Sequence, residues 1–329
     1  MPSFERIESW IAAVPRALAL RAGLELEVFT KIGDGSVTAA SLGAALGVDP
    51  ERLSRLLYAL CSIGLLRVED GRFANGPEAS AYLDASKPGY RGGDHELLRQ
   101  LWSADLLTAD SLRENRPAAL HDFSQAGPEA AAAFNRKIAP GALAFGRTLA
   151  REIDLSAVGS VIDIGGGSGT ALVGLRERWP HLAATLMELP PVAAAARIVL
   201  SDTGIEDVRV EEGDITASPS RDRHDLAILK AVVQVLPPDK ARLSILNAAR
   251  CLRPGGEILI AGWGVIDDDR LGPPDGVFLN ITFLNLYRHG ESYTEGQYRA
   301  WMAEAGFQHI TRSRLPDGCT LIRGRLQAT

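Results

Sequence analysis

The sequence predicts an α/β fold with two domains, a smaller helical one followed by one built on a mostly parallel sheet. The chain has 329 residues, which is more than one hydrophobic core usually organises. From residue 158 onward, short apolar segments alternate with helical segments of about 10 to 15 residues, as in a sheet with helices on both faces. Within that region, residues 160–169 combine a β-branched strand with glycines that open a helix.

The N-terminal region, up to residue 73, is expected to form a winged helix. Residues 5–32 carry apolar side chains at helical spacing, so this amphipathic helix presents a surface that needs a partner. Residues 37–60 read as two helices joined by a turn that contains glycine, and residues 64–73 read as a hairpin with an Asp70-Gly71 turn. We therefore expect an all-helical winged-helix domain with this hairpin as its wing.

Winged helices often bind DNA, but the charge of this chain argues against that function. The candidate recognition helix at residues 50–63 has only Arg52 and Arg55 as bases, and Asp49 and Glu51 offset them. The net charge of −6 provides no basic surface for nucleic acid or for an anionic membrane. We expect a small-molecule partner, with neither nucleic acid nor a membrane as a partner.

Cysteine usage and hydropathy give the expected compartment. The three cysteines, Cys61, Cys251 and Cys319, are isolated in the sequence, which argues against a disulfide framework and against a zinc site. No apolar run is long enough to span a bilayer, and the start lacks the basic region of a signal peptide. The sequence therefore predicts a cytoplasmic protein without a metal.

Between the two main regions, residues 88–150 are predicted to be mostly helical. The alanine-rich run at 129–134 has a high helix propensity. We expect residues 1–100 to form the first domain, 101–150 a helical connector that roofs the substrate pocket, and 151–329 the cofactor-binding domain. Two segments, 307–311 and 319–325, are expected to close the sheet as a hairpin.

The glycine-rich run and three later strand ends predict the ligand. Residues 160–169 place Asp163 at a strand end before the glycines, but no Gly-Lys-Ser/Thr follows, which excludes a phosphate-binding P-loop. Later strand ends carry Glu188, which suits a ribose diol, Asp214, which suits an adenine edge, and Lys230. Three acids and a lysine fit ribose, adenine, an ammonium and a carboxylate, so the predicted cofactor is S-adenosylmethionine. The expected cofactor contacts are Asp163, Gly165, Gly167, Glu188, Leu189, Asp214, Ile215 and Lys230.

Together with these motifs, the runs Leu252-Arg253-Pro254-Gly255-Gly256 and Ala305-Gly306-Phe307 show a resemblance to a known family. The chain resembles the class I methyltransferases, in particular the caffeate-type and bacterial small-molecule O-methyltransferases with a winged-helix dimerisation domain. The resemblance covers almost the whole chain. It implies a Rossmann-like sheet of seven mostly parallel strands, a homodimer, and transfer of a methyl group to a small molecule.

The resemblance fails at the residues that would remove a proton from the acceptor. In the family, a histidine takes the proton of the acceptor hydroxyl, and at its position this chain has Gln234, followed by Val235 in place of an aspartate. A glutamine amide cannot accept a proton near neutral pH. The two acids that orient the histidine are replaced by Gly262 and Ser292, and Tyr293 replaces a usual arginine.

Three interpretations follow from the missing base. The favoured one is methylation of a sulfur or nitrogen acceptor that needs no base, such as the thioether of 4-methylthio-2-hydroxybutyrate, by proximity and orientation alone. The second is O-methylation of an already ionised phenol, or with a base elsewhere, for which the candidates are His121, Tyr287, His289 and Tyr293. The third is a relative that does not methylate, or a winged-helix regulator that senses S-adenosylmethionine.

The residues expected to contact the acceptor come from family positions and from helical spacing. Phe283 and Tyr287 share one face of a helix, and Arg288 beside them has a guanidinium group that can bind a carboxylate. The alternatives are that Phe283 belongs to the core and that Arg288 is a solvated surface charge. The expected substrate contacts are Phe134, Ile138, Gln234, Trp263, Phe283, Tyr287 and Arg288.

Overall fold

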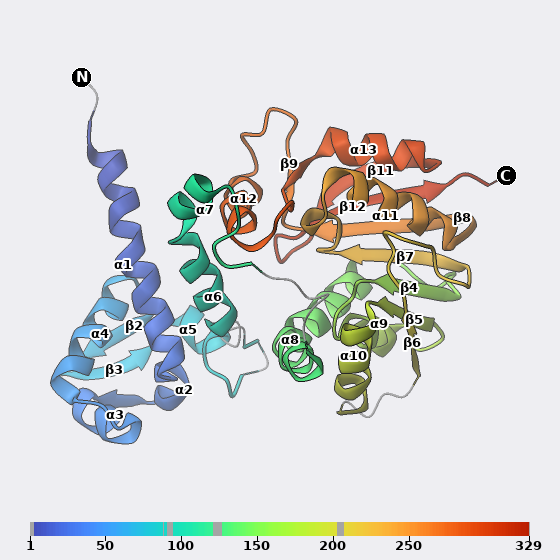
Figure 1. Cartoon of the computed structure of the whole chain (residues 1–329). Coiled ribbons are helices and arrows are strands. Elements are labelled where there is room, and N and C mark those ends of the chain that lie inside the picture. Colours follow the sequence, from blue (N-terminus) through green and yellow to red (C-terminus); the bar gives the residue numbers. More distant parts are fainter. Residues whose placement is uncertain (1–2, 88, 91–94, 121–126, 203–206, 329) are drawn as a thin grey trace. The chain divides into compact units, whose positions relative to one another are not determined.

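The computed structural model describes residues 3–87, 89–90, 95–120, 127–202 and 207–328. The chain divides into two compact units, Met1–Gln100 and Leu101–Thr329 (Figure 1). Among the described residues, no helix is both long enough and apolar enough to cross a membrane.

The first unit is helical with a small antiparallel sheet. The sheet has the strand order β1-β3-β2, and β2 and β3 form the predicted hairpin. Asp70 and Gly71 at its turn both have positive φ angles, 48° and 73°, as a two-residue hairpin turn requires. The prediction of an all-helical domain is therefore too narrow. The elements are α1 (Glu5–Glu25), α2 (Val28–Ile32), β1 (Ser36–Thr38), α3 (Ala39–Leu46), α4 (Pro50–Ser62), β2 (Leu66–Glu69), β3 (Arg72–Asn75) and α5 (Pro77–Tyr82).

The predicted helix at residues 5–32 is interrupted. Helix α1 ends at Glu25, and Glu27 takes a left-handed conformation with φ of 54°, so the chain turns before α2. The second half of the segment packs into the core of the unit, where Val28 and Phe29 are fully buried.

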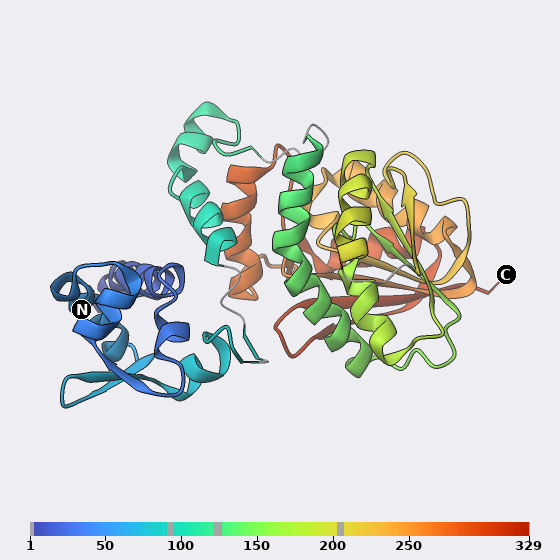
Figure 2. The same ribbon diagram turned by 90° about the horizontal axis from the view of Figure 1, so that it is seen from below.

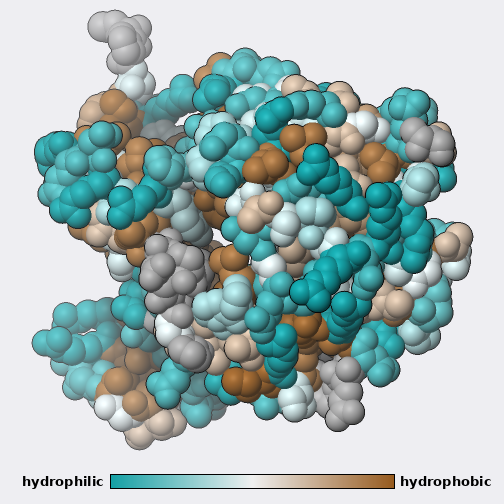
Figure 3. Space-filling view, turned by 45° about the vertical axis from the view of Figure 1, so that its right-hand side comes forward, coloured by the Kyte–Doolittle hydropathy of each residue, from teal (hydrophilic) through white to brown (hydrophobic). Residues whose placement is uncertain are grey.

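The first half of α1 instead exposes a row of large apolar side chains. Trp10 has an exposed fraction of 62%, and hydrophobic side chains lie at the surface among hydrophilic ones (Figure 3). Isolated surface apolar residues are ordinary, but a row of them along one helix is typical of an interaction surface. The row comprises Phe4, Ile7, Trp10, Ile11, Val14 and Leu18.

The second unit contains a seven-stranded sheet with the order β11-β12-β8-β7-β4-β5-β6. All neighbouring strands are parallel except that β12 runs antiparallel to β8 and β11. The expected closing hairpin is β11 with β12, so the predicted Rossmann-like sheet is confirmed. Its strands are β4 (Ser160–Ile164), β5 (Ala183–Glu188), β6 (Val208–Glu212), β7 (His224–Lys230), β8 (Leu252–Gly262), β11 (Phe307–Arg314) and β12 (Thr320–Leu326).

Helices cover both faces of this sheet (Figures 1 and 2). One core cluster joins the sheet to α8, α9 and α10, and a second joins it to α11 and α13. The helices on the sheet are α8 (Pro128–Glu152), α9 (Thr170–Arg178), α10 (Pro190–Asp202), α11 (Pro238–Arg250) and α13 (Glu295–Glu304). The unit also contains α7 (Thr108–Glu114) and α12 (Pro274–Leu286), and α6 (His95–Asp105) crosses the boundary between the two units. Two short parallel strands, β9 (Val265–Ile266) and β10 (Tyr293–Thr294), and a 3-10 turn at Val233–Val235 complete the unit.

Helices α8 and α9 approach each other closely at two glycines. A Cβ added to Gly146 would lie 2.0 Å from the carbonyl oxygen of Ala171, and one added to Gly174 would lie 2.5 Å from the carbonyl oxygen of Leu143. The backbones therefore meet with no side chain between them. This contact fixes the position of α8, whose preceding turns line the pocket described next.

Candidate active site

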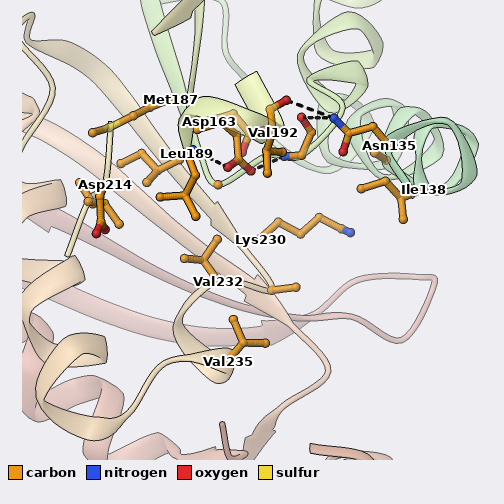
Figure 4. Close-up of a pocket in the computed structure, with 18 of the residues that line it drawn as sticks. Asn135, Ile138, Asp163, Met187, Leu189, Val192, Asp214, Lys230, Val232 and Val235 are labelled. Carbon is orange, nitrogen blue, oxygen red and sulfur yellow. Dashed lines mark hydrogen bonds between the residues drawn. The ribbon is translucent and has the colours of Figure 1, made fainter. Parts of the chain in front are cut away.

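A pocket of about 380 Å³ lies at the carboxyl ends of β4, β5 and β7. In an open α/β sheet, ligands bind beyond these strand ends, where the strand order reverses; here that reversal lies between β4 and β7. Figure 4 shows Met187, Leu189 and Asp214 at one end of the pocket and Asn135, Ile138 and Lys230 at the other. The pocket is therefore elongated and extends across several strand ends.

The glycine-rich loop after β4 needs its glycines. Gly165, Gly167 and Gly169 have φ angles of 69°, 61° and 74°, which side chains disfavour. A Cβ on Gly165 would lie 2.5 Å from Val232, and a Cβ on Gly167 would lie 2.7 Å from Ile138. The loop thus lies against both the turn after β7 and helix α8.

Glu188 at the end of β5 holds this loop in place. One carboxylate oxygen accepts a hydrogen bond from the backbone N–H of Gly167 at 2.9 Å, and the other accepts one from Leu189 at 2.9 Å. Burial raises the pKa of Glu188, while these two backbone hydrogen bonds act in the opposite direction. A carboxylate in this position can also accept hydrogen bonds from a ribose diol.

Asp163 is a buried carboxylate that lines the pocket without a partner. It is 1% exposed, and neither oxygen has a hydrogen-bond partner among the described residues. Its pKa is raised to about 7, chiefly by burial; nearby Lys230 opposes the rise, and Glu188 contributes to it. An unpartnered buried carboxylate is costly, so this position is suited to a ligand that brings positive charge.

Lys230, at the end of β7, provides a cation on the same pocket. Its Nζ lies 5.2 Å from the ring centroid of Phe145 and 5.4 Å from that of Trp263, within cation–π range. In the described part of the chain, no carboxylate forms an ion pair with Lys230, so the ammonium can bind the carboxylate of a ligand.

Asp214 and Ile215 follow β6 and are the last two of the expected cofactor contacts. The carboxylate of Asp214 accepts a hydrogen bond from the N–H of Thr216 at 2.8 Å, and the carbonyl of Ile215 accepts one from the Asn247 side chain at 2.7 Å. All the expected cofactor contacts line this one pocket. Among the described residues, the pocket thus combines the acids Glu188 and Asp214, the buried Asp163 and a lysine without an ion pair, a set of charges that fits S-adenosylmethionine.

We expect Asp163→Asn to change how stability depends on pH. The folded-state pKa is raised, so the folded protein holds a proton that the unfolded chain has lost, and between about pH 4 and 7 the contribution of Asp163 to the free energy of unfolding falls as pH rises. Urea unfolding across this range should show a wild-type slope more negative than the variant's, by at most about 1.4 kcal/mol per pH unit. Parallel curves would show that the carboxylate ionises normally.

Gln234, at the position of the family histidine, does not line the pocket. It is buried, and its side-chain oxygen accepts a hydrogen bond from the backbone N–H of Gly264 at 3.1 Å. A Cβ on Gly262 would lie 2.4 Å from that oxygen. At the other supporting position, the Ser292 hydroxyl donates to the carbonyl of Gly276 at 2.7 Å. The glutamine thus fills the space beside Gly262, and neither supporting position carries an acid.

The candidate bases have different environments. Tyr287 lines the pocket, and burial raises the pKa of its hydroxyl, so it is protonated at neutral pH. Tyr293 is buried in the core, where its hydroxyl donates to the carbonyl of Leu236 and burial raises its pKa far above the usual range. His289 is exposed and does not line the pocket, and His121 lies outside the described residues.

The structure brings together only part of the expected acceptor contacts. Phe134, Ile138 and Tyr287 line the pocket, whereas Gln234 and the exposed Arg288 do not, because their side chains lie elsewhere. Phe283 is buried and packs edge-to-face on Tyr287 with ring centroids 5.6 Å apart, which corresponds to the core alternative. Trp263 contacts Lys230 rather than the pocket itself.

Sequence reasoning missed several apolar residues and one amide in the pocket. Ala131, Asn135 and Ala142 recur on α8 with Phe134 and Ile138 at helical spacing, so periodicity could have assigned the whole face. Val192, Val232, Val235 and Leu236 follow strand ends without any chemical signal.

The fold and the pocket together define a class I methyltransferase that uses S-adenosylmethionine. Residues 115–308 match the model of the O-methyltransferase domain, and residues 14–85 match that of the O-methyltransferase dimerisation domain. The chain belongs to the O-methyltransferase family.

Individual relatives agree with this assignment. The chain is 28% identical over 304 residues to the 3-hydroxy-5-methyl-1-naphthoate 3-O-methyltransferase of Streptomyces sahachiroi, covering 90% of this chain and 87% of that protein. It is 32% identical over 326 residues to the acetylserotonin O-methyltransferase of Mus musculus molossinus, covering 91% and 82%. The structure of human N-acetylserotonin methyltransferase in complex with SAM matches with a TM-score of 0.83 and 22% identity, covering 99% of this chain and 100% of that one.

Proposed function

We propose that this enzyme methylates a hydroxyl group of a small, largely apolar aromatic compound. The observation that supports this most is the distribution of charge in the pocket. The charged residues Asp163, Glu188, Asp214 and Lys230 all lie at or just after the carboxyl ends of strands, where the cofactor is proposed to bind. The rest of the described lining is apolar apart from Asn135, Thr216, Tyr287 and backbone groups.

The relatives favour oxygen over sulfur or nitrogen as the acceptor. Two of them are named for O-methylation of aromatic compounds, a hydroxynaphthoate and acetylserotonin. They do not support the preference for a sulfur or nitrogen acceptor that the missing histidine suggested. A carboxylate-bearing thioether also fits poorly, since Arg288 does not line the pocket and Lys230 serves the cofactor in this proposal.

The residues of the chain act by binding and orientation. Glu188, Asp214 and Lys230 hold the ribose, adenine and carboxylate of S-adenosylmethionine, which when bound supplies an electrophilic methyl group. Phe134, Ile138 and Tyr287 exclude water and orient the acceptor ring. Such alignment can contribute about 7 to 11 kcal/mol to lowering a barrier. Because no histidine lines the pocket among the described residues, the acceptor is proposed to react as its phenolate.

The N-terminal unit is proposed to make a homodimer through α1. A family dimerisation domain covers residues 14–85, and the side chains of the apolar row from Phe4 to Leu18 are about half exposed or more. We propose that the N-terminal unit is a winged-helix domain used for dimerisation rather than for DNA binding. A cytoplasmic location and the division into domains at 1–100, 101–150 and 151–329 stay predictions.

The proposed reaction is tested by methyl transfer from S-adenosylmethionine to a panel of acceptors. We expect turnover of 1-naphthol and of N-acetylserotonin, and little of 4-methylthio-2-hydroxybutyrate. For phenols of different acidity, the pH at which kcat/KM rises should follow the pKa of each phenol, because no enzymatic base assists. A rise at one pH for all phenols would instead reveal a base on the enzyme.

Gln234→His should not raise turnover of an acidic phenol by more than about threefold, although a positioned general base usually contributes far more. The reason is that Gly262 and Ser292 supply no acid to orient an imidazole. Rates of wild type and variant at saturating acceptor and saturating S-adenosylmethionine test this. A gain of a hundredfold would mean that proton removal limits the reaction.

A further inference from the structure

Helix α8 is joined to the glycine-rich loop by one buried amide. Asn135 is fully buried, and its side-chain NH₂ group donates to the carbonyl oxygens of Gly167 and Val192, each at 3.4 Å (Figure 4). Gly167 lies in the cofactor loop and Val192 lies in α10. One side chain therefore connects three elements around the pocket.

The two halves of α8 are held very differently. Pro140 lies inside the helix and has no N–H to donate to the carbonyl of Arg136, so the helical hydrogen bonding is interrupted there. After this point, Phe145 and Leu149 belong to the large core cluster. Before it, the buried apolar cluster between α8 and α10 is small, formed by Ala131, Ala132 and Ala195. An exposed ion pair of Arg136 with Asp202 at 3.7 Å adds little to it.

The break at Pro140 is itself fixed. The hydroxyl of Thr170 donates to the carbonyl oxygen of Ala139 at 2.8 Å, which fastens the helix to the start of α9. The first half of α8 therefore depends on little apolar burial, and Asn135 supplies its polar contact with the loop. Phe134 and Ile138, which line the pocket, are carried by this same half.

We propose that Asn135 is a positioning residue that holds the first half of α8, and with it Phe134 and Ile138, over the acceptor end of the pocket. This rests on the proposed function, since it assigns these two side chains to the acceptor. The cofactor loop has hydrogen bonds of its own, from Gly167 to Glu188 and from Gly165 to the carbonyl of Met187. Loss of Asn135 should therefore loosen the helix more than the loop.

The experiment compares Asn135→Ala with the wild type in kinetics and in hydrogen exchange. With 1-naphthol as the acceptor, we expect KM to rise by about tenfold or more, while the Kd of S-adenosylhomocysteine changes by less than about threefold. Backbone amides at 131–139 should exchange at least about tenfold faster, and those at 143–150 should keep their rates. If Asn135→Ala does not fold, Asn135→Leu replaces it in both measurements, because leucine has a similar volume but cannot donate a hydrogen bond.

Asn75→Ala is a matched control. Asn75 is also buried, its NH₂ group also donates to two carbonyl oxygens, of Phe29 at 2.8 Å and Gly33 at 3.0 Å, and it lies in the first unit. Asn75→Ala should lower the free energy of unfolding. It should not change the exchange rates of the amides at 131–139 or the KM for the acceptor.

The outcomes separate this proposal from the proposed function. Faster exchange confined to 131–139, together with a raised acceptor KM, supports the role of Asn135. Unchanged exchange there, or faster exchange spread over the whole second unit, overturns it. If the wild-type enzyme methylates no phenol, the proposed function fails, and the exchange measurement alone decides whether Asn135 holds the helix.

Discussion

Glu188→Ala should weaken binding of S-adenosylhomocysteine by about 1 to 3 kcal/mol, a roughly 5- to 150-fold rise in Kd by calorimetry. The carboxylate would no longer bind a ribose diol. The change would also leave the N–H groups of Gly167 and Leu189 without their acceptor. Because charge-assisted hydrogen bonds in buried sites are strong, two causes act in the same direction.

Glu212→Ala is the control for this prediction. Glu212 ends the neighbouring strand β6, but it is exposed, pairs with Arg197 at 2.9 Å and does not line the pocket. It should leave the Kd within about twofold, since an exposed ion pair contributes little. Equal affinities of wild type and Glu188→Ala would refute the assignment of Glu188 to the ribose.

Gly146→Ala should lower the free energy of unfolding by about 3 kcal/mol or more. The added methyl group would lie 2.0 Å from the carbonyl oxygen of Ala171, so α8 and α9 must separate. Both helices belong to the main core cluster, and their separation would reduce the burial of Leu149 and Leu172. Denaturant unfolding measures the loss directly.

Helix α8 also contains a control substitution with the opposite expected effect on the free energy of unfolding. Gly141 is exposed, and no heavy atom lies within 4 Å of the position that an added Cβ would take. Gly141→Ala should therefore stabilise the protein by about 0.5 to 1 kcal/mol, because alanine favours the helix. If both substitutions had the same effect, the close approach of α8 and α9 would not exist in solution.

The sheet and the cofactor end of the pocket could be predicted from the sequence because local patterns encode them. Alternating strands and helices determine a parallel sheet, and four of its strands have a charged side chain at or just after their ends. Strand ends converge at one edge, so Asp163, Glu188 and Lys230 could be placed together without coordinates. The interruption of the first helix at Glu27 was missed because nothing in its apolar spacing marks it.

The acceptor end was harder to predict because its geometry depends on long-range packing. Arg288 follows α12 in sequence, directly after Tyr287, yet only Tyr287 lines the pocket. Nor does the sequence show that the Gln234 side chain folds back onto Gly264 instead of facing a substrate. The role of Asn135 depends on two carbonyl groups far away in the chain, which no short motif reports.

The packing of Gln234 against Gly262 also couples these two positions. A side chain added at residue 262 would lie 2.4 Å from the Gln234 side-chain oxygen, so the glutamine would have to rotate away and lose the hydrogen bond from the N–H of Gly264. Substitutions at residues 234 and 262 are therefore not expected to have additive effects. Restoring a histidine at residue 234 should gain less on its own than together with an acid at residue 262.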